Sequence, residues 1–228
     1  KKQYIMNQIQ NKVALVTGGT KGIGYGIAES LLKEGVHVAI TSRSASSAEA
    51  AAQQLNSNSK NGAKAIGIQA DVKDFKSQQR AVETVVKQFG QLDIVVANAG
   101  VGHFANIEDT TLEQWHDTID TNLSGVFYSI KSSVEALKKS KGYFITISSL
   151  AGTNFFANGS AYNASKFGVT GFTQAVMLDL RKYDIKVSTI MPGSVATHFN
   201  GHTPNESDAR KNKKEDIKAL FISILYFN

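Results

Sequence analysis

Short apolar segments alternate with longer segments of helical period along most of this chain. The apolar runs are residues 13–17, 36–41, 65–69, 94–97, 143–148 and 186–191. Between them, residues 23–34, 45–56, 77–89, 112–138 (one long helix or two) and 161–183 repeat apolar side chains at helical spacing. Parallel strands that are covered on both faces have such continuous apolar runs. The pattern therefore predicts an α/β fold, with a single doubly wound parallel sheet and helices on both faces.

Glycine and polar residues gather where these predicted strands end. They are residues 18–24, Ser42 and Arg43, Asp71 and Val72, residues 98–100, Ser149, and Pro192 with Gly193. In a doubly wound sheet, ligands bind at the carboxyl ends of the strands. The agreement between motif and position indicates a ligand site at this edge.

A glycine cluster, Thr17-Gly-Gly-Thr-Lys-Gly-Ile-Gly24, lies between the first predicted strand and the first predicted helix. Glycines there let the backbone approach a pyrophosphate and direct helix N-terminal amides at it. The spacing departs from Gly-x-Gly-x-x-Gly, and a plain tight turn is the alternative. The strand–turn–helix context favours a dinucleotide, with contacts from Gly18, Thr20, Lys21, Gly22, Ile23 and Gly24.

The end of the second predicted strand indicates which dinucleotide is bound. A chain that prefers NAD usually has an acidic residue there, which binds the ribose hydroxyls. This chain has Ser42 and Arg43 at that point, and Lys21 in the glycine loop. A guanidinium pairs well with a phosphate, so NADP(H) is the predicted cofactor. Two solvated surface cations are the alternative.

Tyr162 and Lys166 lie four residues apart in Tyr-Asn-Ala-Ser-Lys, and Ser149 precedes them. On a helix, this spacing places the phenol and the ammonium on one face. A phenol ionises near pH ~10, and a neighbouring positive charge favours its ionised form. We therefore expect Lys166 to lower the pKa of Tyr162, which would make it an acid–base catalyst. Many helices carry such a pair on their surface, so the surrounding motifs decide this interpretation.

Composition and charge exclude several other classes of function. The chain has no cysteine, and its five histidines show no metal-ligand spacing, so no metal site is predicted. Lys1, Lys2 and the basic segment 210–228 carry nearly all of the net charge of +6, which argues against a nucleic acid partner. No apolar run is long enough to span a bilayer and no signal peptide pattern opens the chain, so no membrane association and a cytoplasmic location are expected.

Together these motifs resemble the classical short-chain dehydrogenase/reductase family, from about residue 12 to residue 197, and within it the 3-oxoacyl-acyl-carrier-protein reductases. The resemblance implies a single Rossmann-type, NAD(P)-binding domain. It also implies that Asp71 and Val72 contact the adenine, and that Asn98, Ala99 and Gly100 support the sheet and the cofactor. The segment that wraps the nicotinamide contributes Pro192, Gly193, Val195 and Thr197.

The resemblance further implies hydride transfer between the nicotinamide and a carbonyl or alcohol carbon of a small molecule. The implied catalytic residues are Asn122, Ser149, Tyr162 and Lys166. Tyr162 would donate a proton to the carbonyl oxygen, and Ser149 would position that oxygen. Lys166 would hold the ribose hydroxyls, and Asn122 would keep a water in place for proton supply. Ser149 as a simple loop cap and Asn122 as a simple backbone partner are the alternatives.

The ends of the chain carry separate expectations. Residues 1–11 are predicted to be an N-terminal extension, residues 12–228 the domain, and residues 194–214 the substrate loop. Family members usually have a further helix and a last strand after that loop, and the residues up to 228 cannot supply both. The last edge strand is therefore expected to be missing, truncated or replaced. Family members assemble through this edge, so a homodimer or a homotetramer is expected.

The substrate is the least determined feature of the sequence. Phe155 and Phe156 after Ser149, and His198, Phe199 and His202 after Thr197, indicate an apolar wall for an acyl or alkyl carbonyl, or equally ordinary exposed side chains. A 3-oxoacyl thioester and another carbonyl, sugar or polyol substrate are both open. A non-catalytic NADP-binding sensor or scaffold is the alternative of another class, and the presence of all four implied catalytic residues argues against it.

Overall fold

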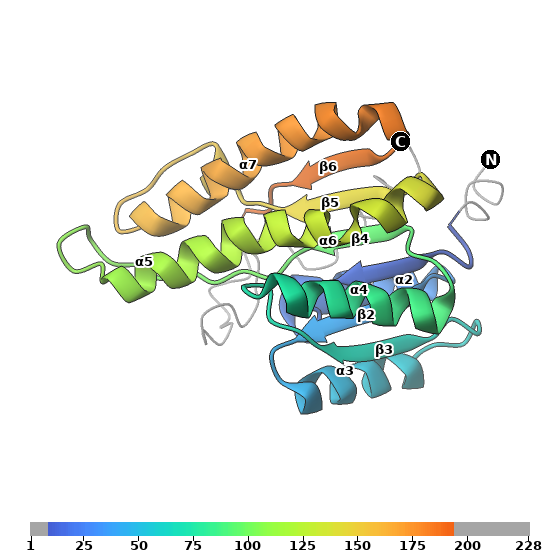
Figure 1. The fold of residues 1–228 in the computed structure, drawn as a ribbon. Helices are drawn as coiled ribbons and strands as arrows, with labels where there is room; N and C mark the ends of the chain where they lie inside the picture. The colour runs from blue at the N-terminus through green and yellow to red at the C-terminus, as the bar shows by residue number, and fades with distance from the viewer. Residues whose placement is uncertain (1–8, 194–228) are drawn as a thin grey trace.

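A parallel β-sheet in the order β3-β2-β1-β4-β5-β6 forms the centre of the fold. The computed structural model describes residues 9–193. Each pair of neighbouring strands is parallel, so all of the arrowheads in Figure 1 lie at the same edge. The strands are β1 (Val13–Val16), β2 (His37–Ser42), β3 (Ala65–Gln69), β4 (Ile94–Ala97), β5 (Tyr143–Ile147) and β6 (Lys186–Ile190). The predicted doubly wound parallel sheet is confirmed.

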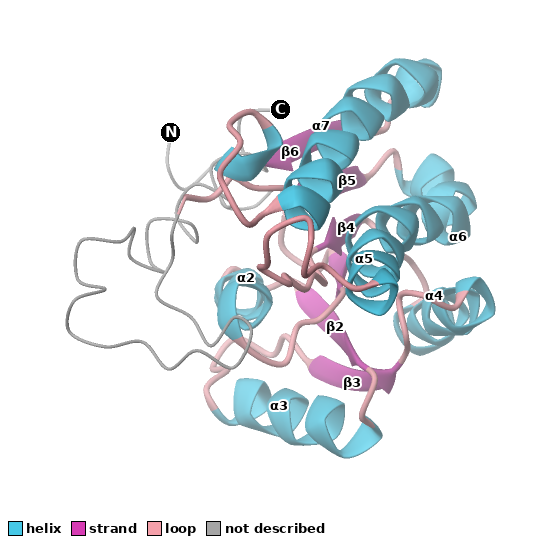
Figure 2. Ribbon diagram, turned by 90° about the vertical axis from the view of Figure 1, so that its left-hand side faces the viewer, coloured by secondary structure: helices cyan, strands magenta, loops and turns pink. Residues whose placement is uncertain are grey.

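Helices cover both faces of this sheet. They are α2 (Gly22–Lys33), α3 (Ala45–Ser57), α4 (Phe75–Phe89), α5 (Leu112–Ile119), α6 (Gly125–Ser140) and α7 (Ser160–Leu180). Figure 2 shows α2 and α3 on one side of the strands and α4 to α7 on the other. Val16 belongs to the core cluster beneath α2 and α3, and Leu15 to the cluster beneath α4, α6 and α7. Because successive side chains enter opposite cores, the strand sequences are continuously apolar.

Side chains that accept backbone hydrogen bonds mark the starts of several helices. Ser44 accepts the amide of Ser47 at the start of α3. Asp74 accepts the amide of Lys76, so α4 begins at Phe75, two residues before the predicted start at residue 77. Gly90 ends the same helix in the left-handed conformation, with φ of 82°.

The segment predicted as one long helix or two contains both α5 and α6. They are joined by a π-helical turn at Asp120–Ser124, so the chain does not leave the helical path between them. A π-helical turn is wider than an α-helical one and often occurs at a functional site. Asn122 lies in this turn and is completely buried.

The strand order reverses between β1 and β4, and at such a switch point a doubly wound sheet has its ligand crevice. From β1 the chain moves outward to β2 and β3, and it then returns to β4 and continues through β5 to β6 on the other side. The loops after β1 and β4 therefore leave the sheet in opposite directions, although the two strands are paired. Ligands bind at this switch point in doubly wound sheets.

The predicted domain boundaries lie at the edges of the described range. Ile9, within the predicted N-terminal extension, is only 3% exposed and packs into the core cluster beneath α2 and α3. The fold thus includes residues that precede residue 12. The substrate loop 194–214 and the expectation of a missing last strand concern residues outside the described range.

Candidate active site

The site lies at the carboxyl edge of the sheet and is built by the loops that follow β1, β4 and β5. Thr17 directly follows β1, is 1% exposed, and connects the first two of these loops. Its hydroxyl accepts the amides of Asn98 at 3.0 Å and Ala99 at 3.1 Å. The side-chain amide of Asn98 in turn donates to the carbonyl oxygens of Thr17 at 2.9 Å and Gly18 at 3.2 Å. Two strand ends of the crevice are thus held together by reciprocal hydrogen bonds.

The glycine loop needs its glycines partly because it packs against the loop after β4. Gly18 has φ of +61°, and a Cβ there would lie 3.0 Å from the Cα of Ala99. A Cβ on Gly24 would collide with the side-chain amide of Asn98. The loop thus presents bare backbone at the crevice, and its last three residues, from Gly22, form the start of α2. Thr20 is half-buried, Lys21 is exposed, and Ile23 packs against the core.

The ends of β2 and β3 place the predicted nucleotide-binding residues at the same edge of the sheet. The Ser42 hydroxyl accepts the amide of Ser44 at 3.3 Å. Arg43 is exposed and its carbonyl oxygen, not its guanidinium, accepts a bond from Gln69 at 3.1 Å. The Asp71 carboxylate accepts the amide of Lys73 at 2.9 Å. Among the described residues the Arg43 guanidinium forms no ion pair, so it is available to an external anion.

Val72, next to Asp71, is 8% exposed and packs against α6. A Cβ on Gly125, the first residue of that helix, would lie 3.0 Å from a methyl group of Val72. Gln78 also donates to the carbonyl oxygens of Val72 at 3.2 Å and Gly125 at 3.0 Å. The loop after β3 is therefore fixed against the helices on this face.

Tyr162, Lys166 and Ser149 meet as the sequence predicts. The Tyr162 hydroxyl is hydrogen-bonded to Ser149, and the Lys166 amine lies 5.7 Å from the centre of the tyrosine ring. Lys166 is 6% exposed and donates to the carbonyl oxygen of Ile147 at 2.9 Å. Ser149 also accepts the amide of Ala151 at 3.1 Å, so it caps its own loop as well. The Ser149 hydroxyl therefore makes the predicted contact with Tyr162 and also caps its own loop, as the alternative has it.

The expected lowering of the Tyr162 pKa is wrong for the chain as described. Burial raises the pKa of Tyr162 above its ordinary value, and the hydrogen bond from Ser149 lowers it less than burial raises it. Burial also lowers the pKa of Lys166 to about 8. Removing either group from water disfavours its charged form, and burial is the largest cause of both shifts. Adjacency on the helix is correct, but the direction of the shift for Tyr162 is the opposite of the expectation.

Asn122 acts through its side chain as a clamp between two segments. Its amide accepts the backbone N–H of Val101 and donates to the Val101 carbonyl oxygen, both at 2.8 Å. It also donates to the Ser165 hydroxyl at 3.0 Å, which itself donates to the carbonyl oxygen of Tyr162 at 2.8 Å. The loop after β4 is thereby tied to the helix that carries Tyr162. Both amide hydrogens of Asn122 are used in these contacts.

Gly100 lies where the loop after β4 passes this clamp. A Cβ at Gly100 would lie 3.3 Å from the side-chain oxygen of Asn122 and 3.8 Å from the Lys166 amine. Pro192 follows β6 and connects this strand end to the loop after β5, because its carbonyl oxygen accepts the amide of Leu150 at 3.0 Å. Gly193 is the last described residue, and Val195 and Thr197 lie outside the described range.

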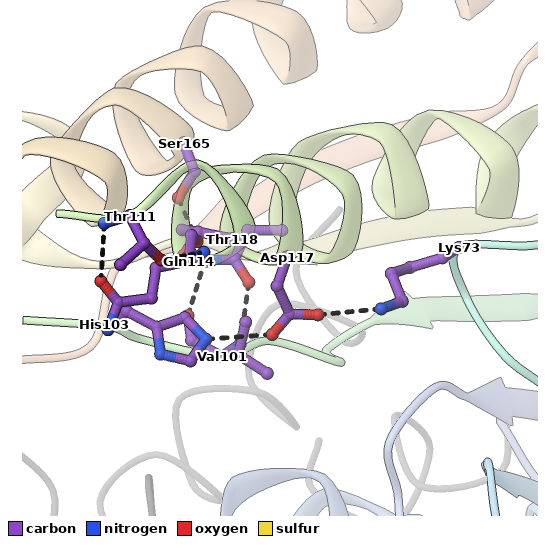
Figure 3. Close-up of polar contacts among 9 residues, drawn as sticks. Lys73, Val101, His103, Thr111, Gln114, Asp117, Thr118 and Ser165 are labelled. Carbon is purple, nitrogen blue, oxygen red and sulfur yellow. Dashed lines mark hydrogen bonds and ion pairs between the residues drawn. The ribbon is translucent and has the colours of Figure 1, made fainter.

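A second polar cluster lies beside this clamp and was missed by sequence reasoning. Asp117 of α5 bonds His103 at 3.0 Å and Lys73 at 2.8 Å, as Figure 3 shows. The hydrogen bonds from His103 and then Lys73 hold the pKa of Asp117 below its ordinary value. The cluster joins the loops after β3 and β4 to α5. Asp117 lies 44 residues from Lys73 and 14 residues from His103 in sequence, so no local pattern marks the cluster.

Asn163 and Thr17 were also missed as individual residues, although both lie inside quoted motifs. The Asn163 side chain is buried and donates to the carbonyl oxygens of Ala151 and Asn154, each at 3.0 Å. It fixes the loop after β5 onto α7. Asparagine is disfavoured inside helices, and this is the signal that marks Asn163 as unusual.

We expect Thr17→Val to lower the free energy of unfolding by about 1–3 kcal/mol, because it leaves the amides of Asn98 and Ala99 without their acceptor. Valine has nearly the same shape, so the effect reports the hydroxyl. Thr17→Ser keeps that hydroxyl and is the matched control. Urea denaturation followed by circular dichroism measures both variants. Equal stability of the valine and serine variants would show that the hydroxyl does not hold the two strand ends together.

Two further observations concern the described residues. In residues 9–193, no three histidine, aspartate or glutamate side chains gather in a way that could hold a metal ion. In the same range, no helix has the length and apolar character needed to cross a bilayer.

Comparison with known proteins places this geometry among related chains. A family model described as short chain dehydrogenase matches residues 12–208. The chain is 34% identical over 229 residues to trans-4-hydroxycyclohexanecarboxylate dehydrogenase of Sinomonas cyclohexanicum, covering 96% of this chain and 88% of that protein. It is 35% identical over 189 residues to 3-oxoacyl-(acyl-carrier-protein) reductase of Escherichia coli, covering 82% and 75%.

Solved structures agree with this relationship. An alcohol dehydrogenase from the archaeon Thermococcus sibiricus, complexed with 5-hydroxy-NADP, superposes with a TM-score of 0.89 at 28% identity, covering 95% of this chain and 91% of that one. A 3-ketoacyl-(acyl-carrier-protein) reductase from Brucella melitensis, complexed with NADH, superposes with a TM-score of 0.85 at 27% identity, covering 93% and 90%. The structures similar to this one thus include complexes with both kinds of nicotinamide dinucleotide.

Proposed function

Because this chain belongs to the short-chain dehydrogenase family, we propose that it is an NADPH-dependent oxidoreductase that reduces a ketone or aldehyde carbonyl of a small molecule. The observation that carries the proposal is the contact of the Tyr162 hydroxyl with Ser149, beside the buried amine of Lys166. These groups lie at the carboxyl edge of the sheet, next to the crevice between β1 and β4. Membership of the family makes the chain an oxidoreductase, whereas the cofactor, the direction and the substrate are parts of the proposal.

Tyr162 serves as the proton donor in this proposal. Its raised pKa keeps the phenol protonated at neutral pH, which suits an acid that protonates a carbonyl oxygen during reduction. Ser149 reaches the same hydroxyl and provides a second hydrogen bond to that oxygen. Two convergent donors orient a carbonyl so that its carbon faces the crevice.

Lys166 and Asn122 assist Tyr162 in this proposal, Lys166 through its amine and Asn122 by positioning a loop. The Lys166 amine has one described acceptor, the carbonyl oxygen of Ile147, and its remaining hydrogens suit the ribose hydroxyls of a dinucleotide. With a pKa of about 8, it exchanges protons near neutral pH and supports proton supply to Tyr162. The Asn122 side chain positions the loop after β4 against α7, and any contact with water would come from its remaining lone pair or its backbone.

The residues of the crevice fit a dinucleotide with a 2′-phosphate. The glycine loop exposes backbone beside the start of α2, and Lys21 and Arg43 place cationic side chains at the same edge. When bound, NADPH supplies the hydride. We assign its proposed contacts to Gly18, Thr20, Lys21, Gly22, Ile23, Gly24, Ser42, Arg43, Asp71, Val72, Asn98, Ala99, Gly100, Tyr162, Lys166, Pro192, Gly193, Val195 and Thr197.

The proposal leaves two classes of substrate. The related Escherichia coli protein is named for 3-oxoacyl groups and the Sinomonas protein for a hydroxycyclohexane carboxylate. A 3-oxoacyl thioester and another carbonyl compound are therefore both candidates. A panel of ketones, aldehydes and acyl thioesters with NADPH and with NADH, followed by loss of cofactor absorbance, tests the proposal. Tight NADPH binding without turnover of any member would contradict it and favour a sensor or scaffold.

We further propose that the protein is a homo-oligomer, at least a homodimer. Four rings form a continuous row across α4, α6 and α7, with Phe75, Tyr128, Phe127 and Phe172 in contact at 5.6–6.2 Å. Phe127 is 45% exposed in the single chain. Exposed aromatic residues grouped on one face are typical of protein interfaces.

Sedimentation velocity is expected to give at least twice the mass of one chain, and Phe127→Glu to reduce it to the mass of a monomer, because a charge in an apolar interface is costly. Phe155→Glu introduces the same charge at a more exposed phenylalanine outside this row, so it is the control and should not change the mass. A monomeric wild-type protein would contradict the proposal.

A further inference from the structure

Two aromatic rings contact the ring of Tyr162, whose hydroxyl the proposed reaction uses. The ring of Phe104 lies 5.5 Å from that of Tyr162 in an edge-to-face arrangement, and the ring of Phe156 lies 6.4 Å from Tyr162. Phe104 and Phe156 also contact each other at 6.0 Å. Phe104 belongs to the loop after β4, and Phe156 to the segment between β5 and α7. Their meeting at Tyr162 is a result of the tertiary fold.

The two phenylalanines are only partly covered. Phe104 is 52% exposed and Phe156 is 46% exposed, so each ring has one part in contact with its neighbours and another part open. An exposed apolar surface of this kind beside a reactive polar group is typical of a ligand site. The rings offer no hydrogen-bond donor or acceptor, so they suit an apolar part of a ligand.

Hydrogen bonds hold the segments that carry Phe104 and Phe156 in place. The buried side chain of Asn163 accepts the amide of Phe156 at 3.4 Å and donates to the carbonyl oxygens of Ala151 and Asn154. A parallel bridge between Ala105 and Gly159 joins the loop of Phe104 to the residue before α7. The rings are therefore arranged before any ligand arrives, which reduces the entropic cost of binding.

We infer that Phe104 and Phe156 form a specificity-determining wall of the substrate site, and that this wall favours ketones with an aromatic or cycloaliphatic ring next to the carbonyl. The inference rests on the proposed function, since it takes Tyr162 as the group that binds the carbonyl oxygen. A ring attached to that carbonyl contacts the open parts of both phenylalanines. A sugar or polyol chain in the same place would lose water without gaining hydrogen bonds, which is unfavourable.

Comparison with Phe155 shows that the wall consists of particular residues and not of every phenylalanine in this region. It adjoins Phe156 in sequence but is 87% exposed, and the ring contacts found among residues 9–193 do not include it. Of the two phenylalanines that the sequence suggests for the pocket, the structure therefore selects Phe156. Phe104 replaces Phe155 as the second member, and Phe155 becomes a suitable control.

The experiment compares ring ketones with a small aliphatic ketone in four proteins: the wild type, Phe104→Ala, Phe156→Ala and Phe155→Ala. Phenyl methyl ketone and cyclohexyl methyl ketone are the ring probes, and 2-butanone is the small probe. We expect each of the first two variants to raise KM for the ring ketones about 5- to 20-fold, the size of one aromatic contact plus lost apolar burial. The kcat for ring ketones and the KM for 2-butanone should change less than about twofold, and Phe155→Ala should match the wild type. Phe104→Tyr keeps the ring and should restore most of the lost affinity.

Several results would overturn the inference. One is a wild type that uses 2-butanone as efficiently as the ring ketones. Another is a ratio of kcat/KM values, ring ketone over 2-butanone, that is the same in the Phe104 and Phe156 variants as in the Phe155 control. Failure of the wild type to reduce any carbonyl compound, despite NADPH binding, would instead refute the proposed function. Thermal unfolding of each variant identifies any that loses activity through misfolding. If Phe104→Ala misfolds, Phe104→Leu, which keeps apolar volume, takes its place.

Discussion

Replacing Tyr162 by phenylalanine is expected to lower kcat for carbonyl reduction by about 10³-fold, within the range lost when a general acid is removed. The substitution deletes only the hydroxyl. The ring still contacts Phe104 and Phe156 and still lies beside the Lys166 amine, so the surrounding structure is preserved. The dissociation constant for NADPH, measured by fluorescence titration, should stay within about twofold of the wild-type value, because Tyr162 is only one of many proposed cofactor contacts.

Tyr183→Phe is the matched control for this experiment. Tyr183 is 37% exposed and packs near Lys138 and Lys182, at the opposite end of α7 from Tyr162. Its substitution removes the same hydroxyl from a different place and should leave kcat unchanged. A Tyr162→Phe variant that retained most of the wild-type turnover would exclude Tyr162 as the proton donor.

Replacing Arg43 by aspartate is expected to raise KM for NADPH by about 10- to 100-fold, the cost of losing a charge-assisted bond and adding a repulsive charge. KM for NADH should rise much less or fall, since that cofactor has no 2′-phosphate and its ribose hydroxyls can donate to a carboxylate. The local backbone should survive the change. It is the Arg43 carbonyl, not the side chain, that accepts the hydrogen bond from Gln69.

Arg181→Asp changes the net charge of the protein by the same amount at an exposed position just before β6, at the other edge of the sheet. It should leave both Michaelis constants within about twofold of wild type, because charges this far apart are screened. If Arg43→Asp left KM for NADPH unchanged, Arg43 would be an ordinary solvated cation and the preference for NADP would need another explanation.

The arrangement of strands and helices followed well from local patterns. Each predicted strand corresponds to an observed one, because burial on both faces demands an uninterrupted apolar run. The start of α4 was misplaced by two residues, since the cap at Asp74 acts before the apolar pattern begins. The π-helical turn around Asn122 was not predicted, since one wider turn barely alters the apolar period.

The candidate site was less evenly predictable. The sequence pointed to the glycine loop, Asn98 and Ser149, because they belong to short motifs at strand ends, and to Tyr162 and Lys166, because they are one turn apart on a helix. The sequence did not mark Phe104, Thr17 and Asn163 as parts of the site, because their contacts are with residues of other segments. Their functions in the fold depend on which loops meet, and no spacing within a single segment reports that.

The amino-acid sequence was sufficient for the doubly wound sheet, the edge that holds the site and the shared helix face of Tyr162 and Lys166. These follow from periodicity and from spacings of a few residues, which operate within one segment. The direction of the Tyr162 pKa shift, the clamp formed by Asn122 and the aromatic wall of Phe104 and Phe156 required the folded chain. Desolvation and packing sum contributions from loops that are distant in sequence, and these loops become neighbours only at the carboxyl edge of the sheet.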